Sequence, residues 1–330
     1  MRTKEAEIRP SGLELYDIEL TPTDEPVRNF RWIREHPGVR VISFDGTKGI
    51  THSYLYKKVE PARYVEVRNA ATELPEHIVL MEDKKTGRLV VAKDENKAMG
   101  GSYFMWTNIP DEAHKTAVEE YPYIATVYGL ATKLGGKLYM IMEYLPNGDL
   151  NEWLKGLHSV KEIGEVVHKL ALALNHIHKV KGMTFGDMKP RNVGFDAEWN
   201  PKVIDFELAE FVAGEEMVYG QPGTYEYAAP EQREKNRLST RGDIYSLAAT
   251  VFSILIDPIP EWDQRSTRTL FERDMGAQIP FRGEYGGKVL RRQRKALSRV
   301  LHKALAKNPE DRYASAMEFD AAFQEALQGK

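Results

Sequence analysis

The spacing of hydrophobic residues changes along the chain, from an alternating pattern in the first half to a helical pattern in the second. The segment VKEIGEVVHKLALALNHIHKVKG, residues 160–182, carries apolar residues at helical spacing: Ile163, Val166, Val167, Leu170, Leu174 and Ile177. This spacing predicts an amphipathic helix that ends at Gly182. Similar patterns predict helices over roughly 240–256 and 290–328.

Short strands are predicted upstream of residue 145. The segments RYVEVRN, HIVLMED and RLVVAKD are typical of strands, KKTG of a turn, and KLYMIMEYL of a later strand. A helix is predicted over TNIPDEAHKTAVEE, where Asn108 can cap the first turn. The first 60 residues are less regular: LTPTDEP indicates a loop, and VRVISF followed by DGTKG indicates a strand and a turn.

Together these patterns predict an α+β, bilobal fold in three parts. Residues 1–60 are an N-terminal extension, either an extra hairpin on the small lobe or a docking element. Residues 61–145 form a small strand-rich part, and residues 146–330 form a larger helical part. A cleft is expected between the two lobes.

The composition excludes several classes of protein. The chain has 46 basic and 49 acidic residues and a net charge of -3, so we expect no nucleic-acid partner. The longest apolar run, from Tyr245 to Ile256, is about half of the ~20 residues that a membrane span needs, and the N-terminus lacks the apolar core of a signal peptide. The absence of cysteine excludes disulfides and thiolate metal sites. We expect a soluble, cytoplasmic protein without a membrane span.

The candidate chemistry lies in GMTFGDMKPRNVGF, residues 182–195. The segments NVGF and PKVIDF are predicted to form an antiparallel hairpin, which brings Asn192 and Asp205 to the same end. Amide and carboxylate oxygens suit Mg²⁺ when phosphate oxygens complete its shell. Asp187 is then close enough to orient an attacking hydroxyl. The alternative is that these three are ordinary turn residues.

At these residues the chain resembles the eukaryotic-type protein kinase family, over about Arg63 to Leu327. The family's catalytic loop H-R-D-x-K-P-x-N appears as FGDMKPRN, its D-F-G as DFE, and its G-T-x-x-Y-x-A-P-E as GTYEYAAPE. The segments VVAK and MEYLPNGDL match the strand lysine and the hinge. The resemblance implies that Asp243 anchors the catalytic loop and that Arg312 pairs with Glu231.

The resemblance also implies a nucleotide site for ATP. Lys93 would hold the α- and β-phosphates with Glu112 as its partner, although Glu119 or Glu120 could substitute for Glu112. Met142 would be the gatekeeper, and Glu143 and Leu145 would offer backbone groups to adenine. Asp149, at the end of the hinge, is also placed among the nucleotide-binding residues.

The remaining residues would carry the transfer. Asp187 would position the substrate hydroxyl, and Lys189 would neutralise the transferred phosphoryl group. Asn192 and Asp205 would bind Mg²⁺, with Mn²⁺ as an alternative. Lys189 and Thr224 favour Ser/Thr over Tyr substrates.

Three departures from the family pattern affect these expectations. The Gly-rich loop position falls on ATELPE, residues 71–76, which has no glycine; a rival placement at FDGTKG is better explained as a hairpin turn. Glu207 replaces the D-F-G glycine without removing Asp205. Gly186 replaces an arginine that usually reads a phosphate, so phosphorylation between Asp205 and Glu231 is not expected to be the switch.

The sequence therefore predicts a Mg-ATP-dependent kinase acting on Ser/Thr of a protein substrate, with a regulatory protein partner as an option. The alternative is a pseudokinase that acts as a scaffold or regulator with weak or no ATP turnover. A kinase-fold enzyme acting on a small molecule is a third reading, against which the intact GTYEYAAPE segment argues. His168, His176 and His178 are expected to pack at interfaces and not to bind metal.

Overall fold

A computed structural model gives the fold. It describes residues 10–22, 39–45, 51–58, 61–67, 74, 77–94, 113, 115, 120–133, 138–156, 158–212, 217–221, 223–255 and 291–329. The chain divides into two compact units. The first consists of Met1–Glu120 with Ala125–Tyr144, and the second of Tyr121–Ile124 with Leu145–Lys330.

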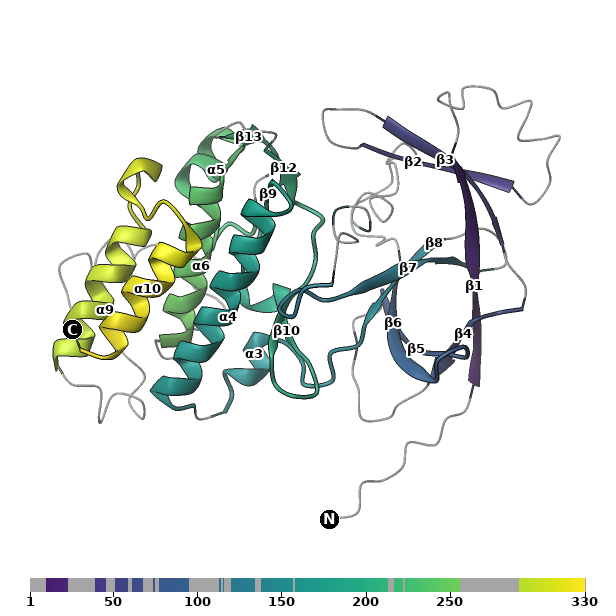
Figure 1. The fold of residues 1–330 in the computed structure, drawn as a ribbon, viewed down its shortest axis with the longest axis horizontal. Coiled ribbons are helices and arrows are strands. Elements are labelled where there is room, and N and C mark those ends of the chain that lie inside the picture. Colours follow the sequence, from purple (N-terminus) through teal and green to yellow (C-terminus); the bar gives the residue numbers. More distant parts are fainter. Residues whose placement is uncertain are drawn as a thin grey trace, which may run out of the picture. The chain divides into compact units, whose positions relative to one another are not determined.

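The described part of the first unit is built on one antiparallel sheet of eight strands (Figure 1). Its strands are β1 (Pro10–Pro22), β2 (Val39–Asp45), β3 (Thr51–Lys58), β4 (Tyr64–Val67), β5 (Ile78–Asp83), β6 (Arg88–Asp94), β7 (Val127–Thr132) and β8 (Leu138–Glu143). They lie in the order β2-β3-β1-β4-β5-β6-β8-β7, and β1 also pairs with β7. The predicted strands downstream of residue 61 correspond to β4, β5, β6 and β8.

The first 60 residues contribute more strand than their sequence indicates. VRVISF forms most of β2, as predicted, and pairs with β3. The predicted loop LTPTDEP is partly wrong, because β1 continues to Pro22, which lies opposite Tyr54 of β3. Backbone pairing with β3 overrides the weak strand propensity of these residues. Asp45 of the predicted turn DGTKG ends β2, and the rest of that turn lies outside the described residues, as does most of the predicted helix after Asn108.

A buried cluster and an ion-pair group hold β1 onto the sheet. Leu15 of β1 is fully buried with residues of β4, β5, β6, β7 and β8. Arg63 donates to both carboxylate oxygens of Asp83, at 2.9 and 2.8 Å, and to Asp17 of β1 at 3.0 Å. Asp83 also accepts from Lys85 N and Thr86 Oγ1. These donors, the Arg63 guanidinium first, lower the pKa of Asp83 to about 2.

The second unit is mainly helical. Its helices are α3 (Leu150–Trp153), α4 (Val160–Lys179), α5 (Pro230–Lys235), α6 (Thr240–Leu255), α9 (Arg291–Ala304) and α10 (Ala316–Leu327), with 3₁₀ turns η2 (Pro190–Asn192) and η3 (Pro309–Asp311). Short strands are β9 (Met183–Thr184), β10 (Val193–Phe195), β11 (Pro201–Val203), β12 (Glu210–Phe211), β13 (Val218–Tyr219) and β14 (Arg237–Leu238).

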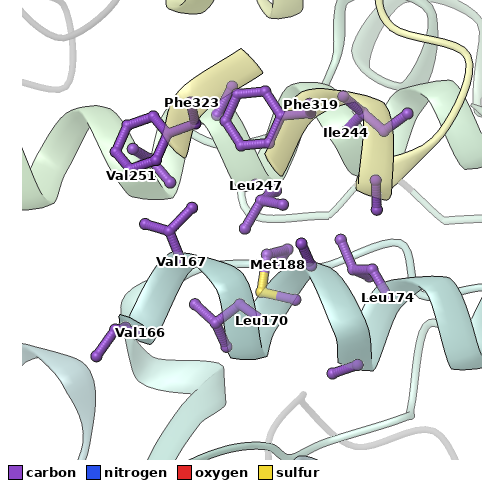
Figure 2. Close-up of a cluster of buried hydrophobic side chains, with 14 of the residues drawn as sticks. Val166, Val167, Leu170, Leu174, Met188, Ile244, Leu247, Val251, Phe319 and Phe323 are labelled. Carbon is purple, nitrogen blue, oxygen red and sulfur yellow. The ribbon is translucent and has the colours of Figure 1, made fainter. Parts of the chain in front are cut away.

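Helix α4 lies at the centre of this unit. It begins with a capping box, in which Ser159 Oγ accepts from Glu162 N and the Glu162 carboxylate accepts from Ser159 N. All of its predicted core residues are buried. Figure 2 shows its apolar side facing residues of α6 and α10, with Met188 of the catalytic loop between the helices. The loop that carries the candidate chemistry is therefore anchored in the core.

The predicted core helix at Tyr245–Ile256 corresponds to α6, which is buried on nearly all sides through Leu255. Across the described residues, none of the helices combines the length and the apolar character that a membrane crossing requires.

Candidate active site

The catalytic loop, residues 183–192, is anchored by the buried carboxylate of Asp243. Asp243, near the start of α6, accepts hydrogen bonds from Phe185 N at 2.7 Å and Gly186 N at 2.8 Å. His178 Nε2 of α4 lies 2.8 Å from Asp243 Oδ2, and both side chains are buried. Asp243 thus fixes two consecutive amides directly before Asp187, which is the anchoring that the sequence resemblance implied.

The hairpin that follows places Asn192 and Asp205 at one end. Strands β10 and β11 are antiparallel, with Val193 opposite Val203. Ile204 N donates to Asn192 O at 3.0 Å, so Asp205 follows one residue beyond the last hairpin bond. The predicted hairpin is confirmed, and its turn is DAEWN.

The carboxylate of Asp187 is the centre of the site. It accepts from Lys189 Nζ at 2.6 Å, from Thr224 N at 2.8 Å and from Asn192 Nδ2 at 3.1 Å. Lys189 Nζ also donates to Thr224 Oγ1 at 2.7 Å. Asp187 and Asn192 are buried, and Lys189 is partly exposed. Four residues predicted from the sequence are therefore brought together by direct hydrogen bonds.

Asn192 and Asp205 have the chemistry of a hard metal site. The Asn192 amide nitrogen donates to Asp187 O at 2.9 Å and to its carboxylate, which leaves the amide oxygen as the atom that could bind a cation. Asp205 has a left-handed backbone with φ +69°, a conformation that is rare outside glycine and concentrates at functional sites. No cluster of three or more His, Cys, Asp or Glu suited to a metal occurs among the residues that the structure describes. Two oxygen ligands suit Mg²⁺ completed by phosphate oxygens.

Gly186 occupies a position where a side chain does not fit. Its φ is +83°, and an added Cβ would lie 2.8 Å from the carbonyl oxygen of Leu208. Its own carbonyl accepts from Gln232 Nε2 at 2.6 Å. Gly223 is equally confined, because a Cβ there would lie 2.5 Å from Gly186 O. The close approach of the catalytic loop to residues 208 and 223 thus depends on two glycines.

Gln232 is a site residue that the sequence reasoning missed. It is almost completely buried in α5, directly after Glu231 of the A-P-E motif. Its partner Gly186 lies 46 residues earlier, so no local pattern links the two residues. The only signal in the sequence is the place of Gln232 directly after the A-P-E motif.

Glu231 and Arg312 form the implied ion pair. Arg312 NH1 and NH2 lie 2.7 and 2.8 Å from the two carboxylate oxygens of Glu231. Both side chains are buried. The pair joins α5, at the end of the GTYEYAAPE segment, to the residues before α10.

The predicted nucleotide-binding residues fall in both units. Lys93 is half-buried in β6, where it lies opposite Met140. Met142 is buried in β8, and Glu143 Oε2 accepts from Thr126 N at 3.0 Å. Glu112, Glu119 and residues 71–76, apart from Leu74, lie outside the described residues. The roles of these residues stay predictions.

Two further predicted residues lie in the second unit. The side chain of Leu145 packs against the backbone of Gly194, where an added Cβ would collide with it. Asp149 is the N-cap of α3, since its Oδ1 accepts from Glu152 N at 3.1 Å. The carboxylate of Asp149 therefore has a structural task whether or not it contacts a nucleotide.

The three histidines of α4 each contact another segment of the second unit. His178 contacts Asp243, and His176 stacks on Tyr121 with ring centroids 4.1 Å apart. His168 Nδ1 lies 2.6 Å from Asp320 Oδ2 of α10. Their contacts agree with the predicted packing role.

Comparison with known proteins gives a consistent result. Residues 77–327 match the model of the protein kinase domain, which is more than half of the chain. The serine/threonine-protein kinase PknB of Mycobacterium tuberculosis is 31% identical over 219 residues, which cover 64% of this chain and 34% of PknB. Ribosomal protein S6 kinase 2 alpha of Xenopus laevis is 30% identical over 203 residues, 60% of this chain and 26% of that protein.

A third relative, the serine/threonine-protein kinase PrkC of Bacillus subtilis, is 26% identical over 221 residues, 66% of this chain and 33% of PrkC. The chain thus spans about a third of the length of the two bacterial relatives. With the kinase domain matched over residues 77–327 and the loop geometry described above, the chain belongs to the protein kinase family.

Proposed function

We propose that this chain is a protein kinase that transfers the γ-phosphoryl group of ATP to a Ser or Thr hydroxyl of a protein substrate. The observation that carries the proposal is the set of three hydrogen bonds that Lys189, Thr224 and Asn192 donate to the Asp187 carboxylate. A buried carboxylate held by several donors is preorganised for one orientation, which is what transition-state stabilisation requires.

In this proposal Asp187 orients the acceptor hydroxyl and receives its proton. The hydroxyl oxygen attacks the γ-phosphorus, the bond from that phosphorus to the β–γ bridging oxygen breaks, and ADP leaves. The hydroxyl proton passes to the Asp187 carboxylate, a transfer that needs the two oxygens within hydrogen-bond reach. The three donors to Asp187 hold the carboxylate in place for that transfer.

Lys189 has two hydrogen-bond partners in this arrangement. Its ammonium group donates to Asp187 and to the Thr224 hydroxyl, at 2.6 and 2.7 Å. A positive charge at this position can offset the charge on the transferred phosphoryl group. The Thr224 contact joins the GTYEYAAPE segment to the loop, which supports the proposed preference for Ser/Thr substrates.

Mg²⁺ is the proposed metal, with Mn²⁺ as an alternative. Asn192, through its amide oxygen, and Asp205, through its carboxylate, would hold it. When bound with ATP, such a cation neutralises phosphate charge. The fit rests on the hard oxygen donors of both residues and on the strained backbone of Asp205.

For the nucleotide we propose Lys93 at the phosphates and backbone groups of Glu143 and Leu145 at adenine, with Met142 as gatekeeper. Glu112 is the proposed partner of Lys93. Use of ATP also supports a cytoplasmic location for the domain. A regulatory protein partner is compatible with this assignment.

A pseudokinase is the second candidate, favoured by one sequence observation. The segment ATELPE, residues 71–76, lies between β4 and β5 in the sequence and contains no glycine to approach phosphate closely. Such a protein would bind a partner and turn over little ATP.

A label-transfer assay separates the two candidates. The wild type and Asp187→Ala are incubated with γ-labelled ATP, Mg²⁺ and a generic basic protein. The proposed function predicts transfer by the wild type alone, and equal or absent transfer in both variants would contradict it. Thermal shifts with ATP, with and without metal, then show whether an inactive protein still binds nucleotide.

A further inference from the structure

Gln232 lies against the catalytic loop and none of the roles above accounts for it. Its side chain is buried, and its amide nitrogen donates to Gly186 O at 2.6 Å. A buried amide without a hydrogen-bond partner costs free energy, so the Gln232 side chain is stabilised in this position by its bond to the Gly186 carbonyl. The bond crosses from α5 to the residue directly before Asp187.

The bond fixes the peptide group that leads into Asp187. Gly186 N is already held by Asp243 Oδ1 at 2.8 Å, and Gly186 O is held by Gln232. Glycine at φ +83° has more rotational freedom than any other residue. The hydrogen bonds at Gly186 N and Gly186 O restrict this freedom. Together they set the direction of the Cα–Cβ bond of Asp187.

The same amide lies beside the residue that precedes Thr224. An added Cβ on Gly223 would lie 2.9 Å from Gln232 Nε2 and 3.0 Å from Asp187 Oδ1. Gly223 thus packs closely against both groups of the Gln232–Gly186 hydrogen bond. From there Thr224 N donates to Asp187 Oδ1 at 2.8 Å. The Gln232 amide therefore holds the loop directly and lies next to the segment that donates to the Asp187 carboxylate.

We propose that Gln232 is a positioning residue for phosphoryl transfer: it holds the Gly186–Asp187 peptide and the Gly223–Thr224 segment so that the Asp187 carboxylate faces the acceptor hydroxyl. This inference rests on the proposed function. It requires a neutral donor at position 232, because an acidic side chain would place an acceptor against Gly186 O and a like charge near Asp187.

The chain offers a matched control in Gln324 of α10. Its Nε2 donates to Gly164 O of α4 at 2.9 Å, a bond of the same kind in the same unit, remote in sequence from the loop. Replacement of either glutamine by methionine keeps side-chain length and removes the donor. Gln324 is less buried and also donates to Asp320 Oδ1 at 3.0 Å, so its replacement controls for the loss of a glutamine-to-backbone bond elsewhere in the unit.

The test compares Gln232→Met, Gln232→Glu and Gln324→Met by steady-state kinetics. We expect kcat to fall about tenfold or more in both Gln232 variants, with KM for ATP within about twofold of wild type and kcat unchanged in Gln324→Met. An unchanged kcat in Gln232→Met, or an equal fall in Gln324→Met, would overturn the inference. If the methionine variant does not fold, Gln232→Glu, which has the same shape as glutamine, replaces it, and an unchanged kcat in Gln232→Glu would overturn the inference.

Hydrogen exchange gives a second readout that does not need activity. Loss of the Gln232 donor should raise exchange at Gly186 and Thr224 amides, and Gln324→Met should not. Unchanged exchange at both amides would overturn the positioning role even if the wild type were inactive. If exchange rises in Gln232→Met and not in Gln324→Met, but the wild type transfers no phosphate, the result would instead count against the proposed function.

Discussion

Arg312 and Glu231 lie 81 positions apart in the sequence and form a buried, two-bond ion pair. The remaining donors of the guanidinium are also used, by the backbone carbonyls of Ala306, Lys307 and Arg241. All five N–H groups of Arg312 therefore have an acceptor, which a lysine could not reproduce.

Removal of one partner of this pair should be strongly destabilising. Glu231→Gln leaves a buried guanidinium with its charge uncompensated, for which the expected loss is about 3–5 kcal/mol of unfolding free energy. Urea unfolding of the variant measures it. The exposed pair Lys155–Glu152 provides the control, since Glu152→Gln should change stability by less than about 1 kcal/mol. Equal effects of the two substitutions would contradict this account.

Gly186→Ala should destabilise the protein by more than its backbone conformation alone explains. The new Cβ would meet Leu208 O at 2.8 Å in addition to the strain at φ +83°. Gly182, at φ +64° with nothing within 4 Å of its added Cβ, isolates the backbone part. We expect about 1 kcal/mol for Gly182→Ala and roughly 2–4 kcal/mol for Gly186→Ala. Thermal unfolding measures the loss of stability in each variant. Equal losses would show that the backbone at Leu208 moves away from the new Cβ without a measurable cost.

Asp83 should give the first unit a pH-dependent contribution to stability. Its pKa is lowered to about 2 by Arg63, so the contribution is fully present above the unfolded pKa near 4 and is lost as the pH falls toward 2. The unfolding free energy of Asp83→Asn should therefore fall below that of wild type by about 2 kcal/mol at pH 7, and the gap should close by pH 2. Glu82→Gln, which removes the surface pair with Lys84, should leave no such gap. A gap that stays constant with pH would contradict the assignment.

Asp205→Asn should remove the metal dependence of nucleotide binding and keep the fold. Asparagine tolerates the left-handed backbone of Asp205, so the change is mainly one of charge. We expect the extra thermal stabilisation that Mg²⁺ adds to ATP to disappear and phosphoryl transfer to fall about 10²-fold or more. Glu198→Gln, an exposed acid in the turn of the same hairpin, is the control. Full Mg²⁺ response in Asp205→Asn would place the metal elsewhere.

Phosphatase treatment should leave the activity unchanged. Between Asp205 and Glu231 the sequence has a single Ser or Thr, Thr224, and its hydroxyl already accepts from Lys189. Residue 186, where the resembling family has an arginine for phosphate, is glycine. The rate before and after a Ser/Thr phosphatase, with mass spectrometry of Thr224, checks this. A large loss of rate would show that a phosphate orders the segment.

Much of the second unit is predictable from the sequence, because its signals are local and periodic. Helix α4 has a capping box and regular apolar spacing, and the β10–β11 hairpin has a turn of suitable composition. Asp187, Lys189 and Asn192 lie within six residues, so the loop motif alone places them together.

Other features depend on contacts that leave no local pattern. The Gln232–Gly186 bond joins residues 46 positions apart and requires a left-handed glycine. The pairing of β1 with β3 extends the strand through LTP, where propensity alone indicated a loop.

The most direct measurement is the steady-state rate of phosphate incorporation into a protein substrate by the wild type and by Asp187→Asn, at saturating Mg-ATP, with identification of the labelled residue. The account predicts phosphoserine or phosphothreonine from the wild type and a rate at least about 10²-fold lower for the variant, with ATP-induced thermal stabilisation retained. Equal rates for the two proteins, or no incorporation by the wild type, would contradict it.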